Sequence, residues 1–123
     1  MLISLVIPAD AAPDLAGQRW ASEVRHVEEL VAASLETGDF HEMERQRFAA
    51  HKLAGRVAHE LPVNARFSCV SAASALSNTA ADLLGPTPAK ALVNARADGR
   101  IYREQMTECE RKLGTAGKPH LPF

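Results

Sequence analysis

The strongest constraint in this 123-residue chain is a row of apolar and small residues that recur at alternating steps of three and four near its C-terminal end. The row consists of Leu92, Ala95, Gly99, Tyr102, Met106, Cys109 and Leu113. This spacing places every member on one side of a helix and is typical of a seam packed against neighbouring helices. Thr87 and Pro88 are a cap and first-turn pair that open the segment, and Gly114 ends it.

Three earlier segments have helical spacing and supply the neighbours that this seam requires. Their expected bounds are 13–38, 39–61 and 64–85. Asp10 or Asp14 is the expected N-cap of the first segment, and Asp39 and Asn64 are those of the next two. The core positions predicted for these segments are Trp20, Val24, Val27, Val31, Leu35, Met43, Ala50, Ala54, Val57, Leu61, Cys69, Ala72, Ala73, Leu76, Ala80 and Leu83.

Short connections favour antiparallel neighbours, so we predict an all-α fold, an antiparallel up-down four-helix bundle over residues 13–113. An aromatic content of only 5% supports thin, closely packed helices over a β-sandwich. Residues 1–12 are expected to form a short apolar arm that covers its own bundle or pairs with a second subunit. Residues 114–123 contain two glycines and two prolines and are expected to be a flexible tail.

Charge and cysteine usage exclude several classes of protein. A net charge of −1 argues against nucleic-acid binding, which needs an excess of basic residues. No apolar run approaches the roughly 18 residues of a membrane span, and no basic region with a long apolar stretch precedes Pro8. We therefore expect a cytoplasmic protein without a membrane segment. Cys69 and Cys109 lack CxxC spacing and are expected to be reduced, buried thiols.

The second segment carries the candidate binding surface. At about 100° per residue, a basic stripe formed by Arg45, Lys52 and Arg56 is expected opposite the buried side. Such a stripe is either a solvated helix face or a surface for an acidic protein partner, with an exposed aromatic residue as an anchor. The predicted binding residues are Arg45, Phe48, Lys52, Gly55, Arg56 and His59.

His51 is expected at the rim of the buried side, with Gly55 one turn further along the segment. The sequence His51-Lys52-Leu53-Ala54-Gly55 resembles the His-x-Leu-x-Gly motif of histidine-containing phosphotransfer domains, which are four-helix bundles. The resemblance implies that His51 accepts a phosphoryl group from a receiver domain, with Lys52 and Arg56 beside the transferred group.

A metal-binding bundle is a further alternative. Glu23 and His26 have the Glu-x-x-His spacing of di-iron bundles, but that chemistry needs a second such pair and two more inward carboxylates. No second pair occurs in the sequence, so no metal ligands are assigned and no cofactor is implied.

The leading prediction is a small non-enzymatic bundle that binds another protein with an acidic surface, or binds itself as a homodimer. It follows from the seam of the last helix, the apolar arm and the absence of a complete catalytic constellation. Phosphotransfer through His51 is the first alternative and metal binding is the second.

Overall fold

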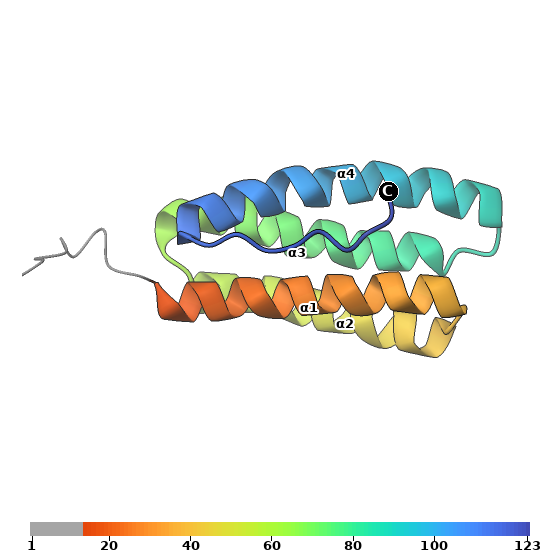
Figure 1. Cartoon of the computed structure of the whole chain (residues 1–123), viewed down its shortest axis with the longest axis horizontal. Coiled ribbons are helices and arrows are strands. Elements are labelled where there is room, and N and C mark those ends of the chain that lie inside the picture. The colour runs from red at the N-terminus through yellow and green to blue at the C-terminus, as the bar shows by residue number, and fades with distance from the viewer. Residues whose placement is uncertain (1–13) are drawn as a thin grey trace, which may run out of the picture.

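The computed structural model describes residues 14–123 and contains four antiparallel helices (Figure 1). They are α1 (Leu15–Thr37), α2 (Phe40–Glu60), α3 (Val63–Leu83) and α4 (Pro88–Leu113). The predicted all-α up-down four-helix bundle is confirmed. The apolar arm predicted for residues 1–12 lies outside the described residues. None of the four helices combines the length and the apolar character that a membrane span requires.

Most of the predicted helix ends are confirmed, because short polar side chains and glycine satisfy the free backbone groups there. The carboxylates of Asp14 and Asp39 each accept a hydrogen bond from the backbone N–H three residues later, at 2.8 and 3.0 Å. Gly38 ends α1 with a φ of 71°, a left-handed conformation that glycine adopts without strain. The predicted cap of α3 is wrong. That helix begins at Val63, and Asn64 lies inside it.

The predicted core is largely confirmed, with a correction on α2. Leu35 and Leu92, also predicted to be core residues, are only half-buried. The buried side of α2 includes Leu53, whereas Ala54, predicted to be buried, is only half-buried. The indole Nε1 of the fully buried Trp20 donates a 2.9 Å hydrogen bond to the carbonyl oxygen of Leu53. This contact turns α2 relative to the expected orientation and places Lys52 and Arg56 beside α1 instead of opposite the core.

The cysteines correct a second prediction, because Cys69 and Cys109 form a disulfide instead of two reduced thiols. Both residues belong to the predicted core rows of adjacent helices, and their Cα atoms lie 4.8 Å apart. Both are fully buried. The bond therefore ties the N-terminal part of α3 to the C-terminal part of α4, across 40 residues of chain.

Residues 114–123 correct a third prediction, since this segment packs on the bundle instead of forming a flexible tail. Near Gly17 the helices α1 and α4 are close, because a Cβ atom there would lie 2.7 Å from Leu113 Cδ2. Beyond that end the tail runs between α1 and α4 (Figure 1). Leu121 is buried, and the ring of Phe123 lies over Gly99.

A buried carboxylate holds the tail in place. Glu28 is fully buried, and its Oε2 accepts hydrogen bonds from the backbone N–H groups of His120, at 2.5 Å, and Leu121, at 3.0 Å. Its Oε1 accepts from the Tyr102 hydroxyl at 2.7 Å and from Arg25 Nη1 at 2.9 Å. These four hydrogen bonds replace those that water would make to the carboxylate. A charged group can be buried at low cost only when its hydrogen bonds are replaced in this way.

The disulfide leads to a stability prediction. Replacing both Cys69 and Cys109 by alanine should lower the free energy of unfolding by about 4 kcal/mol, because a 40-residue loop no longer restricts the unfolded chain. Urea unfolding followed by circular dichroism measures this difference. Thiol titration of the unfolded, unreduced protein is the control and should find no free thiol. Two free thiols per chain would contradict the assignment.

Candidate functional site

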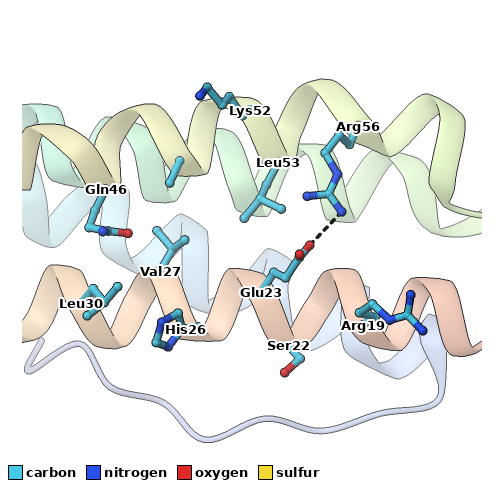
Figure 2. Close-up of a pocket in the computed structure, with 11 residues that line it drawn as sticks. Arg19, Ser22, Glu23, His26, Val27, Leu30, Gln46, Lys52, Leu53 and Arg56 are labelled. Carbon is cyan, nitrogen blue, oxygen red and sulfur yellow. Dashed lines mark ion pairs between the residues drawn. The ribbon is translucent and has the colours of Figure 1, made fainter.

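A groove between α1 and α2 is the candidate site, with a volume of about 590 Å³. The two helices run antiparallel from the Gly38 turn, and the Trp20–Leu53 hydrogen bond fixes their relative position. Side chains from both helices line the groove (Figure 2). They are Arg19, Ser22, Glu23, His26, Val27 and Leu30 of α1, and Gln46, Ala49, Lys52, Leu53 and Arg56 of α2.

The groove has an apolar interior. Val27 and Leu53 are buried members of the core that also line this cavity, and Leu30 and Ala49 are half-buried. Ala49 has only a methyl group and leaves the middle of the groove unfilled. Recessed apolar surface beside polar groups is what a binding site for an apolar side chain requires.

The rim of the groove is basic. Arg19, Lys52 and Arg56 contribute three cations, whereas Glu23 is the one carboxylate among the lining residues. Within residues 14–123, neither Arg19 nor Lys52 has a carboxylate at ion-pair distance. The excess positive charge therefore remains available for an acidic group from outside the chain.

One ion pair crosses the groove and links its two walls. Arg56 Nη2 lies 2.8 Å from Glu23 Oε2, as the dashed line in Figure 2 shows. Arg56 also donates a 2.8 Å hydrogen bond to Glu60 Oε1 and a second one to Glu60 Oε2. These hydrogen bonds keep the pKa of Glu60 below its ordinary value and raise that of Arg56. Arg56 is thus fixed at one end of the groove.

The structure brings together only part of the predicted binding residues. Lys52 and Arg56 line the groove, whereas Arg45, Phe48, Gly55 and His59 do not. Arg45 is exposed and forms an ion pair with Glu42 on its own helix.

The other predicted binding residues lie on the outer side of α2. Phe48 is half exposed, and the Arg47 guanidinium stacks over its ring at 4.4 Å from the centroid. Gly55 and His59 are exposed.

The sequence interpretation missed the α1 wall of the groove. Arg19, His26 and Leu30 follow one another at steps of seven and four, so they lie along one side of the helix. Such a row at the border of an amphipathic helix is the signal that could have located this wall. The row alone does not predict a groove, because the second wall belongs to a neighbouring helix whose position the sequence does not give.

His51 is exposed on α2, outside the groove, rather than at the rim of the core. No carboxylate of residues 14–123 lies at ion-pair distance from its ring. A Cβ atom added at Gly55, one turn further on, would meet nothing within 4 Å. The imidazole is therefore exposed, and no neighbouring side chain lies over Gly55. The cation nearest along this side of the helix is Arg47, four residues before His51, instead of Lys52 or Arg56.

The Glu-x-x-His pair of the metal alternative is occupied by protein contacts. Glu23 pairs with Arg56, and His26 Nδ1 lies 3.9 Å from Glu29. Residues 14–123 contain no group of three or more His, Cys, Asp or Glu side chains that could hold a metal ion.

A pair of carboxyl groups lies apart from the groove, between α3 and α4. Burial, with a hydrogen bond to Asp98 as the next cause, raises the pKa of Asp82 to about 7. The Oδ2 atom of Asp82 is enclosed and accepts no hydrogen bond from the described residues. A proton on Asp82 lets this carboxyl group donate a hydrogen bond to Asp98, whereas an ionised Asp82 would lie beside Asp98 without that hydrogen bond.

No family model matches this chain, and no curated protein or solved structure matches it significantly.

The carboxyl pair predicts a pH dependence of stability. The folded state raises the pKa of Asp82, so its contribution is complete at acidic pH and is lost as the pH rises from about 4 to about 7. Asp82→Asn should therefore be more stable than the wild type at pH 8, and this advantage should shrink at pH 5. We expect about 1–2 kcal/mol at pH 8, less than the full shift implies, because Asp82 is only half-buried.

Urea unfolding at both pH values measures the effect, and Glu104→Gln, an exposed carboxyl group on α4, is the matched control. An Asp82→Asn protein that is destabilised equally at pH 5 and pH 8 would contradict this account of the pair.

Proposed function

We propose that this protein is a non-enzymatic binding module that captures an acidic amphipathic helix of a partner protein in the groove between α1 and α2. The observation that carries the proposal is the combination of an apolar interior with a rim of three cations and one carboxylate. The apolar side of the partner helix fills the space above Ala49. Its carboxylates meet Arg19 and Lys52 on opposite walls.

The shape and charge of the groove support a helical partner. A helix presents apolar residues three and four positions apart, with acidic residues on either side, and so matches an apolar channel between two charged walls. The cations also attract the partner before contact and orient it along the channel. Self-association through the groove requires an acidic helix face of the same kind on a second copy.

The disulfide bears on where this binding takes place. Disulfides form and persist in oxidising compartments and are rare in the cytoplasm. The Cys69–Cys109 bond therefore supports folding in an oxidising environment, whereas the predicted cytoplasmic location rested on sequence features alone. A partner is then to be sought in the same oxidising compartment.

A pair of designed peptides tests the function. The first is an 18-residue amphipathic helix (a length of about 27 Å) with leucine along one side and glutamate beside it. The second has lysine in place of each glutamate. Fluorescence anisotropy should show binding of the acidic peptide alone, and Arg19→Glu with Lys52→Glu should weaken it at least about tenfold.

The matched control is Arg96→Glu with Arg100→Glu, which changes the charge equally at exposed positions on α4. This control should bind the acidic peptide as the wild type does. Equal binding of both peptides, or an equal loss in both double variants, would refute the groove as the binding site.

Phosphotransfer is a second candidate function, supported by the exposure of His51 and the open space above Gly55. The motif that resembles phosphotransfer domains thus has an accessible imidazole. In this reaction a phosphorylated receiver aspartate gives its phosphoryl group to a ring nitrogen, so the P–O bond breaks as a P–N bond forms.

Incubation with phosphorylated receiver domains tests this candidate. His51 should acquire an acid-labile, base-stable phosphoryl group, and His51→Gln should abolish the label. His59→Gln, at another exposed histidine of α2, is the control and should be labelled normally. Labelling that persists in His51→Gln, or no label on the wild type, would exclude phosphotransfer through His51.

A further inference from the structure

Residues 118–123 run along the space between α1 and α4 (Figure 1). Their contacts with Glu28 and Gly99 define a slot between these two helices, which the segment fills. The contacts that anchor this segment are of two kinds. Two backbone N–H groups reach the Glu28 carboxylate, and the side chains of Leu121 and Phe123 pack inward. Glycine at position 99 makes room for the ring, since a Cβ atom there would lie 2.8 Å from Phe123 Cε2.

The acceptor side of the slot is built without the tail. Arg25 and Tyr102 both donate to Glu28, and Arg25 also donates to both carboxylate oxygens of Glu110. Burial alone would lower the pKa of Arg25, but the hydrogen bonds to Glu110 and Glu28 raise it, so Arg25 stays charged. Burial and the adjacent Glu28 raise the pKa of Tyr102, so its hydroxyl stays a donor.

Glu28 consequently remains paired and oriented when the tail leaves. In an empty slot, Glu28 Oε2 would still point to the position of the two backbone N–H groups. The space for the side chains of Leu121 and Phe123, next to Gly99, would also remain. A preformed acceptor of this kind binds an extended segment without first reorganising.

We propose that this slot is an interaction surface between two copies of the chain, in which each copy inserts its C-terminal segment 118–123 into the slot of the other. The anchoring contacts of the segment are made with α1 and α4, so they are identical whichever copy supplies it. Reciprocal exchange of an identical element is a low-cost route to a symmetric dimer, because no contact is lost.

The hinge for this exchange is the short connection after α4. Gly114 ends α4 with a φ of 73°. Gly117 follows three residues later and lies against Arg25 and Glu110, where a Cβ atom would come within 2.6 Å of Glu110 Oε2. A tethered tail competes with a tail from another copy at an effective concentration on the order of millimolar. The tail therefore stays on its own chain in dilute solution and is exchanged at high protein concentration or when the hinge is too short.

Hinge length provides the test. In a chain lacking Thr115 and Ala116 the connection to α4 is two residues, about 7 Å, shorter, so we expect Leu121 to fall short of its own slot and to be placed in that of a second copy. This variant should be a dimer by light scattering, at about twice the 13.3 kDa of one chain. The matched control inserts Gly-Ser after Ala116 and should be a monomer. The unmodified chain should reach the same dimer near millimolar concentration.

Two substitutions in the shortened chain identify the interface from both sides. Leu121→Asp places a charge where the segment buries an apolar side chain, and Gly99→Leu fills the space that the Phe123 ring occupies. Each substitution should return the dimer to a monomer. Should Gly99→Leu fail to fold by circular dichroism, Gly99→Ala replaces it, because its methyl group already meets the Phe123 ring. A monomeric shortened chain, a dimer that survives these substitutions, or an unmodified chain that stays monomeric at millimolar concentration would each overturn the proposal.

Discussion

The arrangement of this bundle depends on the burial of one carboxylate. Glu28 is fully enclosed and receives four hydrogen bonds, two from side chains and two from the backbone of the C-terminal tail. A buried anion with fewer donors would destabilise the fold by several kcal/mol. The need to supply Glu28 with hydrogen-bond donors accounts for the space between α1 and α4 and for the path of the tail through it. Glycine at position 99 leaves room for the end of that tail.

Helix positions and most of the core could be predicted from sequence because they depend on local rules. Apolar spacing determined which sides of α1, α3 and α4 are buried, and Asp14, Asp39 and Gly38 marked helix ends. On α2 the prediction failed at Leu53 and Ala54. There the indole hydrogen bond from Trp20 on another helix decides which residue faces inward, and a single helical wheel contains no such information.

The remaining features were missed for different physical reasons. Half of the groove belongs to α1, so Lys52 and Arg56 could be selected on α2 while the opposite wall could not. The disulfide joins cysteines separated by 40 residues, and only the pairing of α3 with α4 brings them together. The tail is recognised at Glu28 through backbone N–H groups, which every residue except proline carries. The sequence of the tail therefore does not identify Glu28 as its acceptor, although Leu121 and Phe123 are apolar side chains that pack on the bundle.

The disulfide restrains two of the four helices covalently and leaves the other two without a cross-link. It joins α3 to α4, so these helices cannot separate at that point while the bond is intact, whereas α1 and α2 are connected only by their turn and by noncovalent contacts. Regions without such a restraint open at lower free energy than the rest of a protein. The groove lies between two helices that share no covalent cross-link. A ligand that separates α1 from α2 therefore works only against their noncovalent contacts, while the disulfide keeps α3 joined to α4.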